Sequence, residues 1–262
     1  LGILLFASPK MGGVLDNTAK VLGTVMLVLI GYVAFSTNPP VAEAATHAIV
    51  PTNYPWLATI TLIGGTVGGY ITFSGGHRLI DAGITGREHL KDVRRAAFMG
   101  MSVDAIVRIL LFLAVLGVVS MGFALDPKDP AGSAFLLGAG EIGHKLFGIV
   151  FFCAALTSVV GAAYTSVSFL KTLFKVVERY EKLTIMAFIF VSTCILIFIG
   201  KPATLLIVAG SVNGLILPVT LAVMLLATRK TNIVGDYKHN PVLFYTGWIV
   251  VLVTAYIGVT SL

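Results

Sequence analysis

Charge is what this chain has least of. Only 11% of its residues are charged, whereas 57% are hydrophobic, and its mean hydropathy is +0.96. A soluble globular domain carries roughly 25% charged residues, so the composition excludes one. The solvent for most of this chain is a lipid bilayer.

Cysteine is also scarce. The chain has 2 cysteines, Cys153 and Cys194, and both lie inside apolar runs. Two thiols in separate hydrophobic segments predict neither a disulfide framework nor a cysteine metal cluster. We expect both side chains to serve packing.

Hydrophobic runs long enough to cross about 30 Å of hydrocarbon recur along the chain. The fourth run is too long for one span, and we expect a short amphipathic lead-in before a helix from about Leu146. We interpret residues 1–262 as a single transmembrane domain. Because Leu1–Ala7 is apolar and resembles the end of an earlier span, we expect the chain to be part of a longer protein. The runs lie at about Ala19–Ser36, Trp56–Ala82, Ala97–Phe123, Ser133–Phe174, Leu183–Gly200, Thr204–Thr228 and Pro241–Leu262.

The net charge of +6 reports membrane topology and predicts no nucleic-acid partner. Basic residues concentrate in the loops after the second, fourth and sixth runs, and the intervening loops are nearly free of them. The positive-inside rule places these three loops in the cytoplasm of a multi-pass protein of the cell (plasma) membrane. No obligate protein partner is predicted. The basic residues are Arg87, Lys91, Arg94, Arg95, then Lys171, Lys175, Arg179, Lys182, then Arg229, Lys230 and Lys238.

The most informative segment is rich in glycine and lies inside an apolar run. Residues 63–70 contain two glycine pairs, Gly64-Gly65 and Gly68-Gly69. Glycine costs about 1 kcal/mol relative to alanine inside a helix, so we expect a discontinuous helix at about Trp56–Ala82. Transporters build ion sites at such breaks, where protein or a watery cavity satisfies the backbone. The alternative is close helix packing through small residues.

This break offers hard oxygen donors. If the first helix ends near Gly64, its negative dipole end and the carbonyls of Gly65 and Thr66 point into the gap, together with the Thr66 hydroxyl. Such donors suit Mg²⁺, Mn²⁺, Ca²⁺ or Na⁺ better than softer metals. The Tyr70 hydroxyl has two interpretations, contact with the water shell of an ion or a position at a seam between helices.

Asp104 and Arg108 are charged residues inside the third run. Their spacing of four places both on one face of a helix and predicts an intramembrane ion pair. Charged groups within the membrane are functional candidates. A structural pair is the alternative that we favour.

The sixth run contains a second group of breakers and polar residues. Gly210-Ser211-Val212-Asn213-Gly214, followed by Pro218, predicts a second place where the backbone is loosened. The Asn213 carboxamide suits hydrogen bonding to coordinated water, and bonding between helices is the equal alternative. The hydroxyl residues of the fourth run, Thr157 to Ser168, are interpreted as contacts between helices rather than cavity lining.

These segments together resemble the NRAMP divalent-metal transporters. Residues 64–70, Gly-Gly-Thr-Val-Gly-Gly-Tyr, are similar to a family segment that reads roughly Gly-Ala-Thr-Val-Met-Pro-His. Asp104 falls where the family has an Asp, Leu156-Thr157-Ser158 resembles its Gln-Ser-Ser element, and Leu217-Pro218 resembles the Leu-Pro of its tenth helix. The resemblance implies an all-α integral membrane protein with a LeuT-like inverted-repeat bundle. It also implies that this chain covers family helices five to eleven and that the carboxylate of the first family helix lies upstream.

The departures from the family pattern concern the ion. Gly68, Gly69 and Tyr70 stand where the family has Met, Pro and His. Without a thioether the site loses the ligand that favours transition metals, and without the His it loses a group that titrates near neutral pH. The chain therefore resembles the NRAMP-related magnesium transporter branch, with a site roomy enough for hydrated Mg²⁺. The implied metal-site residues are Gly65, Thr66, Gly68, Gly69, Tyr70, Ser211 and Asn213.

We therefore expect a secondary-type transporter that takes up hydrated Mg²⁺ and Mn²⁺, driven by concentration and voltage, without proton coupling and without a cofactor. The alternatives are a proton-coupled transition-metal transporter of the NRAMP type and a LeuT-fold carrier of a small organic substrate. An enzyme is not expected, because Ser74-Gly75-Gly76-His77 lacks a partnered acid or a nucleophile elbow. An ion channel ranks below a carrier, since the sequence has no filter-like repeat or acidic ring.

Overall fold

The computed structural model describes residues 11–68, 71–127, 129–200 and 202–261, and the regular elements within these ranges are all helices. The chain divides into two compact units. The first comprises Leu1–Thr52 and Ile84–Ala163, and the second comprises Asn53–Gly83 and Tyr164–Leu262.

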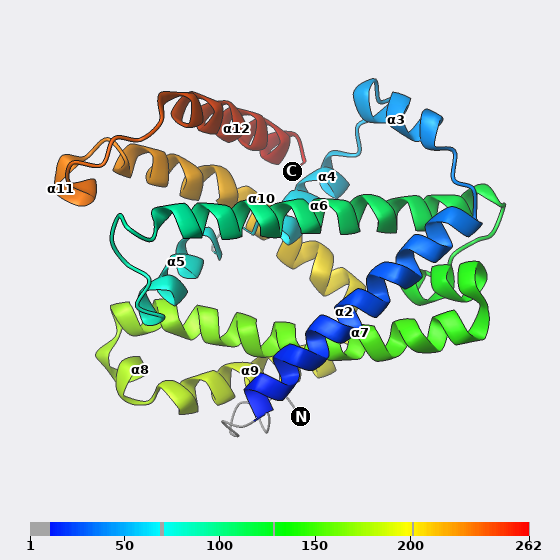
Figure 1. Ribbon diagram of the computed structural model, residues 1–262, viewed down its shortest axis with the longest axis horizontal. Coiled ribbons are helices and arrows are strands. Elements are labelled where there is room, and N and C mark those ends of the chain that lie inside the picture. The colour runs from blue at the N-terminus through cyan, green and yellow to red at the C-terminus, as the bar shows by residue number, and fades with distance from the viewer. Residues whose placement is uncertain (1–10, 69–70, 128, 201, 262) are drawn as a thin grey trace. The chain divides into compact units, whose positions relative to one another are not determined.

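The first unit is built around the crossing of two long helices. These are α2 (Met11–Ser36) and α6 (Leu90–Ser120), which pack against each other (Figure 1). A Cβ on Gly117 of α6 would overlap the Thr37 side chain beyond the end of α2, so glycine permits the close approach there. The buried core of this unit also includes residues of α7 (Pro130–Leu173); it consists of Leu29, Ile30, Val33, Ala34, Ala114, Val118, Phe135 and Phe147.

The sequence predicted that the run ending at Phe174 has two parts, and the structure confirms this with an earlier boundary. Gly140 has φ 67° and ψ −169° inside α7, so two helices meet there at a kink. Glycine adopts positive φ without a Cβ penalty, and Asp129 caps the first helix by accepting the Gly132 amide at 2.9 Å. The rings of Phe135 and Phe147 stack across the kink with centroids 4.5 Å apart.

A short helix, α3 (Val41–Ile49), lies between the first two hydrophobic runs, in the segment Thr37–Pro55 that we interpret from the sequence as an outside loop. It follows Pro39-Pro40 and is bent by 101° from the preceding helix. Pro40 is the N-cap residue with φ −74° and ψ 72°, and a residue before a proline is disfavoured from the helical region, so the preceding helix ends and α3 begins directly after the proline pair. The proline pair therefore redirects the chain and starts a new helix, rather than leaving a loop.

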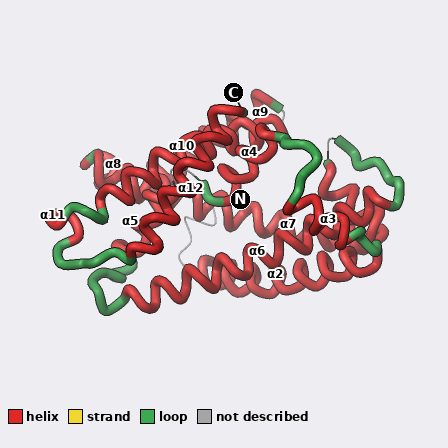
Figure 2. Tube along the Cα trace, turned by 90° about the horizontal axis from the view of Figure 1, so that it is seen from above, coloured by secondary structure: helices red, strands yellow, loops and turns green. Residues whose placement is uncertain are grey.

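The second unit holds the broken helix. The glycine-rich run forms α4 (Trp56–Thr66) and α5 (Ile71–Asp81), and it is accompanied by the part of α7 from Tyr164 onward. Figure 2 shows α4 beside α10 (Pro202–Ala227) and α12 (Pro241–Thr260), and these helices pack on one another. The remaining helices are α8 (Lys175–Arg179), α9 (Glu181–Ile199) and α11 (Thr231–Val234).

Local sequence explains where these helices begin and end. Gly200 has φ 63° and donates its amide to the Leu196 carbonyl, which closes α9 with a left-handed cap. Asn240 accepts the Val242 amide at 2.9 Å and stands before Pro241, so α12 starts with a side-chain cap and a proline.

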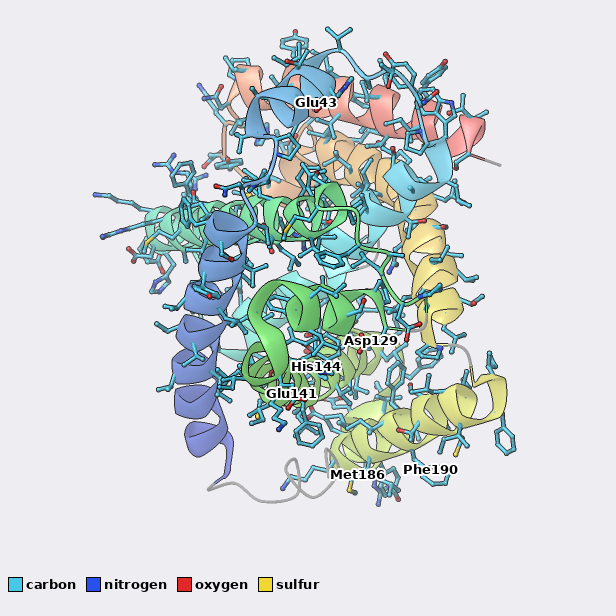
Figure 3. The ribbon with its side chains drawn as sticks, turned by 90° about the vertical axis from the view of Figure 1, so that its right-hand side faces the viewer. Glu43, Asp129, Glu141, His144, Met186 and Phe190 are labelled. Carbon is cyan, nitrogen blue, oxygen red and sulfur yellow. The ribbon has the colours of Figure 1, made fainter. Side chains whose placement is uncertain are left out.

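Within the described residues, 5 helices are long and apolar enough to cross a membrane, namely α6, α7, α9, α10 and α12; the bent pair formed by α2 and α3 raises the number to 6. The surface of α9 shows why this composition suits lipid. Ile185 and Ile189 are buried, whereas Phe190 is 62% exposed, and Figure 3 shows Met186 and Phe190 extending from the same side of the helix. The prediction of an all-α membrane bundle is confirmed, and the architecture is consistent with a LeuT-like bundle.

The prediction of a second backbone interruption, in the sixth run, is wrong. α10 is one helix from Pro202 to Ala227, and it continues through residues 210–214 and through Pro218. Its glycines are tolerated within the helix because they contact α4, as described below. Pro218 removes one helical hydrogen-bond donor without ending the helix.

Candidate functional site

The break between α4 and α5 is the centre of the candidate site, and the prediction of a discontinuous helix is confirmed. α4 closes with a hydrogen bond from the Val67 amide to the Ile63 carbonyl, and Gly68 follows with φ 68°. A left-handed residue of this kind costs an L side chain roughly 1–2 kcal/mol, which glycine avoids. Gly69 and Tyr70 lie outside the described residues.

The helix ends two residues later than expected, at Thr66 rather than near Gly64. The carbonyls of its last turn, which include those of Gly65 and Thr66, belong to the negative end of the helix dipole. The Thr66 hydroxyl donates to the Leu62 carbonyl, so its lone pairs remain the part available to a cation. Both residues are exposed. The described end of α4 therefore offers oxygen donors only.

Gly64 has the packing role that was the alternative interpretation of the glycine pairs. A Cβ on Gly64 would overlap the Gly210 carbonyl and the Gly214 amide of α10. In the reverse direction, a Cβ on Gly210 would lie 2.8 Å from the Thr61 carbonyl oxygen. The backbones of α4 and α10 are thus in direct contact through three glycines. In the first glycine pair, Gly64 permits the close packing of α4 on α10. In the second pair, Gly68 adopts the positive φ that follows the end of α4.

Ser211 is brought to α4, one helical turn before the break. Its hydroxyl oxygen lies 2.8 Å from that of Thr61, and Thr61 precedes Gly65 by one turn. Asn213 is half-buried on α10, and its carboxamide makes no hydrogen bond within the described part of the chain. The structure therefore joins Ser211 to the helix that carries the break, while Asn213 is unengaged.

The predicted ion pair is present on α6, in the first unit. Arg108 Nε donates to Asp104 Oδ2 at 2.6 Å, and the side chains of Arg108 and Asp104 are 45% and 52% exposed. The geometry is that of a paired i, i+4 contact on one helix face.

A polar cluster that local sequence patterns do not predict lies at the end of α5, and we call it the Asp81 cluster. Lys171 Nζ of α7 donates to Asp81 Oδ2 at 3.1 Å and to Glu181 Oε1, at the start of α9, at 3.3 Å. Tyr164 and Ser168 also donate their hydroxyls to Asp81. One ammonium group therefore links α5, α7 and α9.

Spacing is the signal that would have predicted one side of this cluster. Tyr164, Ser168 and Lys171 follow at intervals of four and three, which places them on one face of a helix. Asp81 is 90 positions before Lys171, and Glu181 lies 10 positions after it in the next helix, so local spacing does not predict that either carboxylate pairs with this face. His77 of α5 faces the same helix, with its ring 5.5 Å from that of Phe169.

Replacing Lys171 with methionine is expected to loosen α5. The change leaves two carboxylates without their shared cation, and hydrogen bonds to charged groups are worth about 1.5–3 kcal/mol. Amide hydrogen exchange in α5 should rise at least about tenfold, as measured by mass spectrometry on the full protein. Lys175→Met is the control, because the Lys175 side chain has no ion-pair partner among the described residues. Equal exchange in α5 for both variants would refute the link.

Side-chain ligands for a metal do not gather elsewhere in the described part of the chain. No group of three or more His, Cys, Asp and Glu residues has a metal-holding arrangement there. The break in the glycine-rich helix is therefore the ion-site candidate that the described geometry supports, and its donors are backbone and hydroxyl oxygens.

Comparison with known proteins supplies the family. The model of the Nramp family, described as natural resistance-associated macrophage protein-like, matches residues 1–262. An uncharacterized membrane protein of Bacillus subtilis (strain 168), YcsG, is 48% identical over 262 residues, which are 100% of this chain and 65% of that protein. An uncharacterized membrane protein of Haemophilus influenzae is 49% identical over 255 residues, which are 97% of this chain and 64% of that protein.

The chain thus spans slightly less than two thirds of the length of these relatives. The family match covers the broken helix, the ion pair and the α4–α10 contact alike. On the sequence match and the helical architecture together, the chain belongs to the Nramp family.

Proposed function

We propose that the full protein carries divalent metal ions across the cell membrane and that hydrated Mg²⁺, with Mn²⁺, is its main substrate. The observation that carries this proposal is the helix break after Thr66 in a chain of the Nramp family. Broken helices inside membranes build ion sites from carbonyls and helix ends. The donors at this break suit hard cations.

The preference for Mg²⁺ rests on what is absent from the described break. Residues 64–68 offer no thioether, thiol or imidazole, and Gly68 stands where the family has its Met. Soft ligands favour transition metals, whereas oxygen ligands and retained water favour Mg²⁺. In this proposal Gly65, Thr66, Gly68, Gly69 and Tyr70 form the ion path. Ser211 and Asn213 supply polar groups from α10.

The membrane potential is sufficient to drive such uptake. A charge gains about 2.3 kcal/mol per 100 mV, so a divalent cation gains about 4.6 kcal/mol. This is more than a thousandfold accumulation. With the three basic loops in the cytoplasm, the inside-negative potential draws the cation inward. The proposed transport therefore needs no proton.

Uptake into proteoliposomes tests the proposal directly. The full-length protein is reconstituted, a potassium gradient with valinomycin sets the voltage, and internal Mg²⁺ and pH are recorded together. We expect Mg²⁺ entry that increases with inside-negative voltage and leaves the internal pH unchanged. Metal entry accompanied by acidification would instead assign the protein to proton-coupled transport. Absence of divalent-metal entry, with competition by a small organic solute, would favour an organic-substrate carrier.

A further inference from the structure

A small pocket with a mixed polar and apolar lining is found in the second unit, where the chain passes from α10 through α11 to α12. Its volume is about 300 Å³. The lining includes side chains that donate hydrogen bonds or carry positive charge, and these lie outside the proposed ion path. They are Arg229, Thr231, Tyr237, Lys238 and His239, with Phe244 as the aromatic wall.

The charge in and around this pocket is mainly positive. The segment from residue 229 to residue 239 contains three basic residues, Arg229, Lys230 and Lys238, and one acidic residue, Asp236. The Lys238 ammonium has no ion-pair or hydrogen-bond partner among the described residues. Arginine and lysine are pure donors, and their strongest partners are carboxylate and phosphate oxygens. The pocket therefore suits an anion rich in acceptors.

Arg229 is exposed, and an aromatic contact orients its side chain. Its guanidinium carbon lies 4.1 Å from the centroid of the Phe244 ring, on the first turns of α12. A cation over an aromatic face at this distance is favourable, and the planar guanidinium keeps edge donors for a ligand. The contact fixes a donor between the end of α10 and the start of α12.

The location of the pocket favours a lipid over a soluble anion as its ligand. Both flanking helices are long and apolar enough to cross a membrane. The pocket lies after the end of α10 and at the beginning of α12. Next to it, Leu226 is 53% exposed, Val242 is 65% exposed and Leu243 is 57% exposed. An anion with acyl chains covers these side chains, whereas free phosphate leaves them uncovered.

We propose that this pocket binds the phosphate group of an anionic phospholipid headgroup. Arg229 and Lys238 hold the phosphate oxygens, and Thr231 and Tyr237 add hydroxyl donors. The acyl chains lie along the exposed apolar surface at the adjoining ends of α10 and α12. Basic pockets between membrane helices recognise anionic headgroups on this principle. The site is independent of ion transport, so its test does not depend on the metal.

Native mass spectrometry of the full-length protein in a non-ionic detergent tests the proposal. Phosphatidylglycerol and phosphatidylcholine are titrated separately, and glycerol 1-phosphate is the soluble competitor. We expect one tight phosphatidylglycerol per protein, bound at least about tenfold more tightly than phosphatidylcholine and displaced by glycerol 1-phosphate only at far higher concentration. Arg229→Gln/Lys238→Gln should weaken this binding by roughly tenfold to thirtyfold, since each cation near an anionic surface contributes about fivefold.

Two further variants keep the test decisive. Lys175→Gln/Lys182→Gln removes the same charge from a different basic segment of the same unit and should bind phosphatidylglycerol as the unchanged protein does. Lys238→Gln alone leaves the Arg229–Phe244 contact intact and should still weaken binding by about fivefold. Equal losses in both double variants, no preference for phosphatidylglycerol, or equally tight binding of glycerol 1-phosphate would each overturn the lipid assignment.

Discussion

Replacing Gly64 with alanine is expected to disrupt the contact between α4 and α10 and to destabilise the protein severely. The added methyl group overlaps the Gly210 carbonyl and the Gly214 amide, which are backbone atoms that cannot rotate away. Overpacking costs about 1–3 kcal/mol even where side chains can adjust, so a backbone clash should exceed this range. The expected readout is aggregation or a large fall in the unfolding temperature of the full protein in detergent.

Gly65→Ala is the matched control, because the same methyl group one residue later meets no atom within 4 Å beyond the adjacent residues and backbone of its own helix. Alanine is the better helix former by about 1 kcal/mol. Gly65→Ala should therefore keep or raise the unfolding temperature. A similar effect of both substitutions would contradict the proposed packing role of Gly64.

The open space beside Gly65 also permits a test of transport. A bulky side chain at Gly65, as in Gly65→Phe, should leave the fold intact and reduce Mg²⁺ uptake, because it stands at the end of α4 where the ion donors lie. Full uptake by this well-folded variant would remove Gly65 from the proposed ion path.

The second prediction concerns the identity of the ion. Gly68→Met restores the thioether that the family resemblance places at this position, and it should raise the affinity for Cd²⁺ relative to Mg²⁺ by about tenfold, or ~1.4 kcal/mol. The structure adds a cost, because φ at residue 68 is 68° and a side chain there is strained by roughly 1–2 kcal/mol.

Gly68→Ala separates these two effects, since it carries the same backbone strain without a soft ligand. Competition of Cd²⁺ with Mg²⁺ uptake should increase from the alanine variant to the methionine variant. If the two variants have the same Cd²⁺ to Mg²⁺ ratio, soft ligation at residue 68 does not set selectivity and the strain alone explains any change.

The helices and the break could be predicted from local sequence because their causes are local. The hydropathy of the apolar runs predicts the membrane spans. The low helix propensity of glycine predicts the break. The same reasoning failed for α10, where Gly210 and Gly214 read as breakers. Their role depends on Gly64, which is distant in sequence. A contact between glycines of two helices cannot be predicted from either helix alone, because it depends on how the helices pack.

The Asp81 cluster shows the same limit for polar residues. Each member has an ordinary explanation within its own segment: a basic loop, a hydroxyl face or a helix end. Lys171 is 90 positions from Asp81 and 10 from Glu181, yet one ammonium group contacts both. Local periodicity predicts which face a residue occupies, whereas the partner depends on the fold of the whole unit.

The glycine contact between α4 and α10 has a mechanical consequence. Where the two backbones touch, no side chain separates them and no Cβ can be added without overlap. We therefore expect α4 and α10 to move together as one rigid unit. We expect any bending between α4 and α5 to occur at Gly68, the residue without a Cβ that follows α4. The other end of α5 is held against α7 by Asp81, which accepts hydrogen bonds from Lys171, Tyr164 and Ser168.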